Sequence, residues 1–288
     1  MTMANLIGFV YNAQMPDAGA LVSTIVEALG LRDRSWRSSA AGLGEMVSEL
    51  ESTNLIVVVG GDGTILRTVR VVAPFDAPII GINMGRVGFM SELRVEDALE
   101  KLPSYLDDGM RTEERMMLQA SVFGESQESP RFTVHALNDI VVGRSAIARL
   151  LNIDVAIDTV QMPTSRADAV IVSTATGSTG YAMSAGGPIL YPEAQLMVVR
   201  PVAAHTGLRD ALVVPPDSVI ELRVKDGLHT MLSADGFQDS SLDRSETVSV
   251  SRSPHVVRFL RAHAPSSFYS ALMWRLGLQP LHEQPSPE

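Results

Sequence analysis

The sequence Gly-Gly-Asp-Gly-Thr at positions 60–64 is the feature that most constrains the fold of this chain. An uninterrupted apolar run, rich in β-branched residues, fills positions 55–59 directly before it, and apolar residues recur at helical spacing over 64–72. A continuous β-branched run is typical of a strand that helices cover on both faces. We therefore expect a buried strand, a tight glycine turn and a helix in succession, as in an open parallel sheet.

Strand-like and helix-like segments alternate through the first 110 residues. Short apolar runs at 6–10 and 78–82 predict further buried strands, and helical spacing at 18–31 and 43–50 predicts helices. This β-α-β order favours a doubly wound parallel sheet. We predict an α/β nucleotide-binding domain over residues 1–110.

The pattern changes after Arg111. Apolar and polar residues alternate at 118–122, 220–224 and 248–250, which indicates strands with one exposed face. Clusters of turn residues separate these stretches. We therefore expect residues 111–261 to form a mainly β domain, and the family resemblance given below implies what this domain binds.

The C-terminal segment returns to helical spacing, with Phe268, Leu272 and Leu276 on one face. We expect this segment, 262–278, to contain a helix that packs back on the N-terminal domain. The last residues, 279–288, include three prolines and are predicted to be disordered.

The composition excludes several classes of function. The formal net charge is −10 and no block of Lys or Arg occurs, so we expect neither nucleic acid nor a membrane as a partner. The chain has no cysteine, and its six histidines are not paired at metal-ligand spacing, so no protein-bound metal is expected. The apolar runs are strand-sized, far short of the roughly 20 residues that span a bilayer. These features predict a cytoplasmic protein.

The glycine turn has the chemistry of a phosphate site. Glycines allow backbone N–H groups to approach a phosphate closely, and the following helix N-terminus favours negative charge. Asp62 falls at the carboxyl end of its strand, where open α/β sheets bind ligands, and a carboxylate suits deprotonation of a hydroxyl acceptor. No Gly-Lys-Ser/Thr follows, so the turn is not a P-loop. A purely structural Asp-Gly turn remains the alternative.

A second group of small polar residues follows a predicted strand. Positions 174–181 read Thr-Ala-Thr-Gly-Ser-Thr-Gly-Tyr, and positions 184–188 read Ser-Ala-Gly-Gly-Pro. Such a segment offers many hydrogen-bond donors and acceptors with little bulk, which suits contact with a ribose and a diphosphate. Two other interpretations remain open: a loop whose hydroxyls satisfy their own backbone, and a serine nucleophile at Ser184.

These motifs resemble known families. The glycine turn resembles the superfamily of NAD kinases, diacylglycerol and sphingosine kinases and phosphofructokinases, and the segments at 174–181 and 184–188 resemble NAD kinases specifically. The pairs Asn138-Asp139 and Asp235-Gly236 and the stretches at 85–89 and 114–118 are also similar to that family. The resemblance runs from about residue 4 to Gly277.

The NAD kinase resemblance implies roles for individual residues. Asp62 would be the catalytic base, Phe89 would pack the NAD adenine, and Asn138 and Asp139 would hold ribose hydroxyls. Other implied contacts to the substrate are Gly63, Arg149, Arg166, Asp168, Thr179, Gly180, Tyr181, Ser184, Ala203 and Gln238. The implied phosphate-binding residues are Gly60, Gly61, Thr64 and Arg67.

The same resemblance implies a reaction, in which the γ-phosphoryl group of ATP moves to the 2′-hydroxyl of the adenosine ribose of NAD. Mg²⁺ would accompany the ATP, with polyphosphate as another candidate donor, and the chain would assemble as a homodimer or homotetramer. The alternatives are a lipid kinase of the diacylglycerol type and a non-catalytic regulator that binds NAD or NADP.

Overall fold

The computed structural model describes residues 6–85, 88–106, 109–125, 127–145, 150–225 and 230–278, and in β17 it leaves the side chains of 238 and 239 undescribed. The predicted tail, 279–288, lies outside these ranges. The chain divides into two compact units, which are treated separately below. The first unit comprises Met1–Thr68, Ala77–Thr112 and Phe259–Glu288, and the second comprises Val69–Asp76 and Glu113–Arg258.

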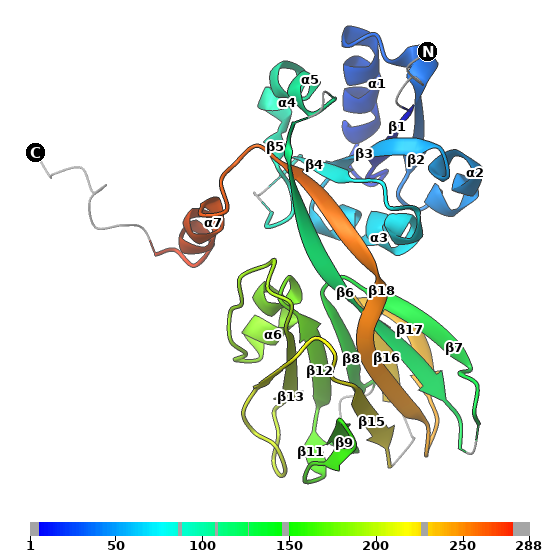
Figure 1. Cartoon of the computed structure of the whole chain (residues 1–288), viewed down its shortest axis with the longest axis vertical. Helices are drawn as coiled ribbons and strands as arrows, with labels where there is room; N and C mark the ends of the chain where they lie inside the picture. The colour runs from blue at the N-terminus through cyan, green and yellow to red at the C-terminus, as the bar shows by residue number, and fades with distance from the viewer. Residues whose placement is uncertain are drawn as a thin grey trace, which may run out of the picture. The chain divides into compact units, whose positions relative to one another are not determined.

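The first unit is built on a parallel sheet (Figure 1). Its strands are β1 (Leu6–Tyr11), β2 (Ser35–Ser39), β3 (Thr53–Gly60), β4 (Ile79–Asn83) and β5 (Leu93–Arg94). The strand order is β2-β1-β3-β4, with β5 parallel to β4 and the end of β18 pairing with β4 at Phe259. The predicted parallel α/β sheet is confirmed.

Helices also occur in this part of the chain. They are α1 (Ala18–Ala28), α2 (Val47–Leu50), α3 (Asp62–Val72), α4 (Val95–Lys101), α5 (Pro103–Leu106) and α7 (Ser267–Arg275), with 3-10 turns η1 (Arg32–Arg34), η2 (Leu43–Glu45) and η3 (Ala73–Phe75). Residues of α1, α4 and α5 share one buried cluster with alternate residues of β1, β3 and β4. Ile80 and Ile82 of β4 belong to this cluster, so Gly81 between them faces the opposite side of the sheet. Ile65 of α3 lies against Gly81, which places α3 on that opposite face. The uninterrupted run in β3 is buried for this reason.

Two strands of the first unit, β2 and the short β5, were not predicted. β2 has the sequence Ser-Trp-Arg-Ser-Ser, which lacks the apolar run of a central strand, because it pairs with β1 alone at the end of the strand order. Its Trp36 indole donates to Thr53 Oγ1 at 2.9 Å and covers Gly8 of β1. The aromatic ring occupies the space that a side chain at Gly8 would need.

The second unit contains two antiparallel sheets. Its strands are β6 (Arg111–Phe123), β7 (Phe132–Ala136), β8 (Asp139–Arg144), β9 (Leu151–Ile157), β10 (Val160–Gln161), β11 (Ser165–Ala167), β12 (Ala169–Thr174), β13 (Met197–Val202), β14 (Leu212–Val214), β15 (Ile220–Val224), β16 (Thr230–Ala234), β17 (Phe237–Leu242) and β18 (Thr247–Arg261), with the short helices η4 (Gly177–Thr179) and α6 (Tyr181–Ser184). One sheet has the order β14-β13-β12-β8-β16-β17, and the other runs β10-β9-β15-β18 with β6 and β7. This confirms a mainly β part of the chain.

The core of the second unit lies between its two sheets. Val142, Val172 and Leu232 of one sheet share a buried cluster with Val155 and Leu222 of the other. Because alternate residues of each strand point inward, the strands carry the period-two pattern seen in the sequence. Within the described residues, no helix is long and apolar enough to cross a membrane.

The packing of Trp36 on Gly8 generates a stability prediction. A Cβ at position 8 would overlap the indole ring of Trp36 in the middle of the sheet. We expect Gly8→Ala to destabilise the chain by about 1–3 kcal/mol, the usual cost of overpacking a core. The control is Gly44→Ala, where a Cβ meets nothing within 4 Å and the change should stay below about 0.5 kcal/mol. Urea unfolding of both variants measures the difference, and equal stabilities would contradict this account of the β1–β2 contact.

Candidate functional site

The Asp62 carboxylate is held in place by the backbone of a neighbouring loop. Asp62 opens α3 directly after β3 and Gly61. Its Oδ2 accepts a hydrogen bond from the N–H of Phe89 at 2.9 Å, and its Oδ1 accepts one from the N–H of Met90 at 3.3 Å. The side chain stays 25% exposed, so a substrate hydroxyl can reach it. The turn therefore presents a fixed, accessible carboxylate at the carboxyl end of the parallel sheet.

Glycines make this close approach possible. A Cβ at Gly88 would overlap Oδ1 of Asp62, so the loop contacts the carboxylate only because position 88 has no side chain. A Cβ at Gly60 would likewise overlap Oγ1 of Thr64 in the first turn of α3. These two glycines are required by packing around Asp62 and Thr64.

The remaining residues of the glycine turn are placed as follows. The N–H of Thr64 donates to the carbonyl of Gly61 at 2.8 Å, and the Thr64 side chain is buried. Gly63 and Arg67 lie on the exposed side of α3. All of the sequence-predicted residues in positions 60–67 thus belong to one strand-to-helix junction, and their role in phosphate binding stays a prediction.

Phe89 lies between two residues of the C-terminal helix. The Arg275 guanidinium lies 4.1 Å from the centre of the Phe89 ring, and the Phe268 ring lies 6.2 Å from it. Arg275 Nη2 is also 3.5 Å from Asp62 Oδ2. The helix α7 thus contacts the residue predicted to pack the adenine and the predicted base, which agrees with the expected packing of the C-terminal helix. Leu276, predicted on the packed face, is instead exposed.

In the second unit, Asp235 holds the turn that contains Asn138 and Asp139. Its carboxylate accepts hydrogen bonds from the N–H groups of Leu137 at 2.9 Å, Asn138 at 2.6 Å and Asp139 at 3.2 Å. Asp235 has a left-handed φ of 54° and is followed by Gly236 with φ of 78°. A non-glycine residue in this conformation is strained, and such strain is common at functional sites.

The environment of Asp139 changes its protonation. The side chain is buried, and burial together with the neighbouring Asp235 carboxylate raises the pKa of Asp139 to about 7. Burial also raises the pKa of Asp235, against the three N–H groups that lower it. Asp139 therefore exchanges a proton near neutral pH, which suits a group that hydrogen-bonds to hydroxyls.

The Thr-Gly-Ser segment packs directly on the Asn138 turn. A Cβ at Gly177 would overlap the carbonyl oxygen of Asn138, and Thr174 donates its hydroxyl to the Leu137 carbonyl at 2.6 Å. Within the described part of the chain, Asn138 Oδ1 is buried without a hydrogen-bond partner. A buried acceptor of this kind calls for a donor from a ligand or a water molecule.

Several hydroxyls of this segment satisfy the backbone, as the structural alternative proposed. Ser178 donates to the Ala175 carbonyl at 2.7 Å, and Thr179 donates to the Thr176 carbonyl at 3.2 Å. Tyr181 is 45% exposed, so it is not a core tyrosine, and Ser184 is exposed as well. Gly180 lies beside the pair Asn138-Asp139, since a Cβ there would be 3.9 Å from Asn138 Nδ2 and 4.0 Å from Asp139 Oδ2. The structure therefore groups Thr179, Gly180 and Tyr181 near the Asn138 turn.

Three predicted residues lie at the edge of β12 and β13. Asp168 forms an ion pair with Arg144 at 3.1 Å, and both side chains are partly exposed. Arg166 is exposed on β11, where its backbone pairs with Thr206. Ala203 is exposed with a left-handed φ of 49°. Arg149 lies outside the described residues, as does the side chain of Gln238.

Three contributions were missed or only partly anticipated from the sequence. Asp235 was noted for its resemblance, but its hydrogen bonds to the Asn138 turn were not foreseen. Arg115 is buried and donates to Thr176 Oγ1 at 3.1 Å, which anchors the Thr-Gly-Ser segment. Arg275 was treated only as part of a helix. An arginine directly before the apolar residues 116–118 is the one sequence signal that could have pointed to Arg115. The contacts of Asp235 and Arg275 depend on the fold and leave no such signal.

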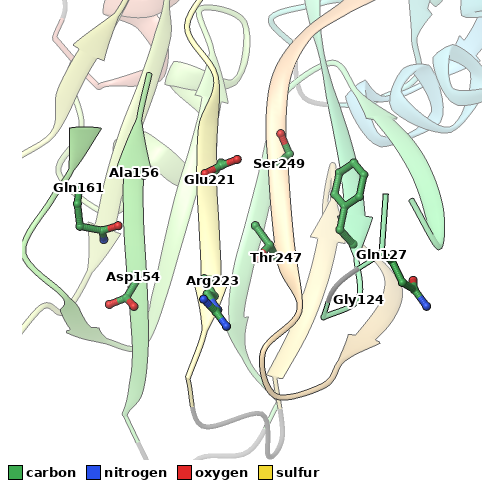
Figure 2. Close-up of a pocket in the computed structure, with 10 residues that line it drawn as sticks. Gly124, Gln127, Asp154, Ala156, Gln161, Glu221, Arg223, Thr247 and Ser249 are labelled. Atoms are coloured by element: carbon green, nitrogen blue, oxygen red, sulfur yellow. The ribbon is translucent and has the colours of Figure 1, made fainter. Parts of the chain in front are cut away.

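A cavity of about 530 Å³ lies on the outer face of β9, β15 and β18 in the second unit (Figure 2). Two of its three charged lining residues have partners: Asp154 pairs with Lys225 at 2.9 Å, and Arg223 lies 3.8 Å from Glu125. The residues predicted from the sequence do not line it. This surface is therefore a solvated sheet face and not the candidate site.

The pKa of Asp139 generates a prediction about pH. Folded Asp139 keeps its proton up to about pH 7, whereas an unfolded aspartate ionises near pH 4, so folding takes up a proton between these values. The wild type therefore loses stability as the pH rises through this range, and Asp139→Asn does not ionise. We expect the stability of Asp139→Asn relative to wild type to increase by about 2 kcal/mol between pH 5 and pH 8.

Urea unfolding at the two pH values measures this shift. The control is Gly44→Ala, which removes no titratable group and whose effect should be the same at both pH values. A constant stability difference for Asp139→Asn would show that Asp139 ionises normally.

Comparisons with known proteins agree with this geometry. The model of the ATP-NAD kinase N-terminal domain matches residues 45–110, and the model of the ATP-NAD kinase C-terminal domain matches residues 137–262. An NAD kinase of Dehalococcoides mccartyi is 37% identical over 278 residues, covering 95% of this chain and 96% of that protein.

Solved structures give the same result. An NAD kinase from Archaeoglobus fulgidus in complex with ATP superposes with a TM-score of 0.73 at 27% identity, covering 95% of this chain and 99% of that chain. The fold is also that of a yeast NADH kinase complexed with NADH, with a TM-score of 0.85 at 19% identity over 100% of this chain and 91% of that chain. The two matched domain models and the identity over nearly the full length show that this chain belongs to the ATP-NAD kinase family.

Proposed function

We propose that the chain is an NAD kinase that transfers the γ-phosphoryl group of ATP to the 2′-hydroxyl of the adenosine ribose of NAD, giving NADP. The observation that supports this most directly is the Asp62 carboxylate, fixed by the N–H groups of Phe89 and Met90 and still accessible. Family membership favours this function over a lipid kinase or a non-catalytic regulator.

Asp62 acts as the general base in this proposal. The carboxylate accepts the proton of the ribose hydroxyl while the oxygen attacks the γ-phosphorus, and the bond to the β-phosphate oxygen breaks. A base in hydrogen-bond contact with the hydroxyl contributes about 10²–10⁴-fold to the rate. The two backbone N–H groups keep the carboxylate aligned for this step, so little reorganisation is needed when the substrate binds.

The residues of the second unit hold the dinucleotide. Asn138 and Asp139 bind ribose hydroxyls in this proposal, which is supported by Asn138 Oδ1, a buried acceptor with no hydrogen-bond partner among the described residues. Tyr181 offers an exposed ring and hydroxyl beside them. Arg166, Asp168, Ser184 and Ala203 are exposed or partly exposed and supply further contacts to the substrate.

The donor binds with Mg²⁺. Among the described residues, no group of three or more His, Asp or Glu side chains is placed to hold a metal ion. The ion neutralises charge on the β- and γ-phosphates. Gly60, Gly61, Thr64 and Arg67 form the strand-to-helix junction that receives the donor phosphates in this proposal. Assembly into a homodimer or homotetramer stays a prediction.

A matrix of substrates tests the function. ATP and polyphosphate are each combined with NAD and NADH, and NADP or NADPH formation is followed. We expect product with ATP and NAD. The matrix also settles the acceptor and the donor, which the relatives leave open, since one similar structure is an NADH kinase. Phosphorylation of diacylglycerol without any NADP formation would contradict the proposal.

The role of Asp62 is tested with Asp62→Asn. The amide keeps the size of the side chain but does not accept a proton, so we expect kcat to fall by about 10²–10⁴-fold. The dissociation constant for NAD, measured by calorimetry, should change little because Asp62 acts on the reacting hydroxyl. Asp33→Asn, at an exposed position outside the site, serves as the control and should retain full activity. Wild-type kcat in Asp62→Asn would rule out this base.

A further inference from the structure

We propose that Arg275 of the C-terminal helix is a further catalytic residue, whose guanidinium binds the phosphoryl group during its transfer. This inference rests on the proposed function, because it places Arg275 at the phosphate that Asp62 helps to deliver to NAD. The observation behind it is that a C-terminal arginine lies next to the proposed base.

Arg275 makes contacts with two residues of the candidate site. Its Nη2 lies 3.5 Å from Asp62 Oδ2, and its guanidinium lies 4.1 Å from the centre of the Phe89 ring. Stacking on an aromatic ring holds a guanidinium flat while its N–H groups stay directed outward in the plane. Phe89 therefore orients the donors of Arg275 next to the carboxylate of Asp62.

The contact with Asp62 is not that of a tight structural ion pair. Charge-assisted N–H···O bonds are about 2.7–2.9 Å long, and the 3.5 Å separation exceeds this by more than half an ångström. Both side chains are also partly exposed, at 32% and 25%. A loose, solvated pair of this kind leaves the guanidinium able to turn toward an anion.

The helix that carries Arg275 does not need this contact to form a core. All nine residues of α7 are at least partly exposed, and Tyr269, Met273 and Trp274 expose large apolar side chains. If α7 served only to complete the fold, we would expect its apolar residues to be buried. The contacts of α7 among the described residues include those with Asp62 and Phe89, two residues of the candidate site.

The geometry of phosphoryl transfer places a charge within reach of Arg275. A hydroxyl that gives its proton to Asp62 lies about 2.6–3.2 Å from the carboxylate. The phosphorus bonds to that same oxygen, so the equatorial phosphoryl oxygens lie a few ångströms from the guanidinium. Arginine matches phosphate with two parallel N–H···O bonds and stabilises the charge that spreads over these oxygens.

A cavity lies beside the residue that precedes Arg275. Trp274 lines this cavity of about 510 Å³ with Asn83, Met84 and Arg94 at the carboxyl end of β4, and Glu96 and Asp97 line it as well. Open parallel sheets bind ligands at this end of their strands.

Arg275 stays positively charged throughout the phosphoryl transfer. The 2′-hydroxyl loses its proton to Asp62, a new O–P bond forms, and the bond from γ-phosphorus to the bridging oxygen breaks, so that ADP leaves with the electron pair. Arg275 keeps its protons throughout, as an arginine does in proteins. Its contribution is the positive charge that this acidic chain, at −10 overall, needs beside the reacting phosphate.

The test compares Arg275→Ala and Arg275→Lys with wild type in steady-state assays of NADP formation. We expect Arg275→Ala to lower kcat by about 10³–10⁵-fold, as for other arginines that contact a transferring phosphoryl group, while the dissociation constant for NAD changes little. Arg275→Lys keeps the charge and should retain intermediate activity. Added guanidinium should restore part of the activity of Arg275→Ala and none of that of Asp62→Asn.

The control is Met273→Ala, an exposed position on the same helix, which should keep wild-type kcat. A kcat for Arg275→Ala within about threefold of wild type would overturn the proposal while leaving the kinase function intact. A loss that guanidinium does not restore, or that Met273→Ala shares, would assign α7 a structural role and overturn it as well. Failure of the wild type to form NADP would instead reject the proposed function itself.

Discussion

The hydrogen bonds from Phe89 and Met90 to the Asp62 carboxylate are the interaction on which the first unit depends. They follow from the parallel pairing of β3 and β4, which puts Gly60 opposite Asn83 so that the loops after both strands start side by side. The loop after β4 then turns its N–H groups onto the residue after β3. Gly88 is essential to this arrangement because any side chain there would occupy the place of the carboxylate.

In the second unit, too, a carboxylate accepts hydrogen bonds from backbone N–H groups, but there it fixes a turn. A buried carboxylate, Asp235, accepts three backbone N–H groups and fixes the turn that carries Asn138 and Asp139. Placing this carboxylate next to Asp139 costs stability, since both pKa values rise with burial. The left-handed backbone conformation of Asp235 also costs stability, and strain of this kind occurs mainly at functional sites. Stability is given up at this turn, where the proposed function places the groups that bind ribose hydroxyls.

The sequence predicts the parts of the fold that depend on local pattern. The run in β3 and the helical spacing of α3 define the glycine turn, and alternation defines the sandwich of the second unit. β2 was missed because a strand with a single neighbour needs no apolar run, and its Trp36 gains its role only through contact with Gly8.

The candidate site shows the same limit. Asp62 is predictable because its motif is contiguous, whereas Arg275 lies more than two hundred positions away and approaches Asp62 only in the folded chain. Asp235 likewise reaches residues nearly a hundred positions earlier. Contacts of this kind leave no periodicity or spacing in the sequence, so the folded structure is needed to find them.

The most direct test of the central claim is a crystal structure of the chain with NAD bound, in which the distance from the Asp62 carboxylate to the ribose 2′-oxygen is measured. The account predicts a hydrogen bond of about 2.6–3.2 Å, with Asp62 still bound by the N–H groups of Phe89 and Met90. A 2′-oxygen that is bonded to another side chain, with Asp62 facing solvent, would contradict it.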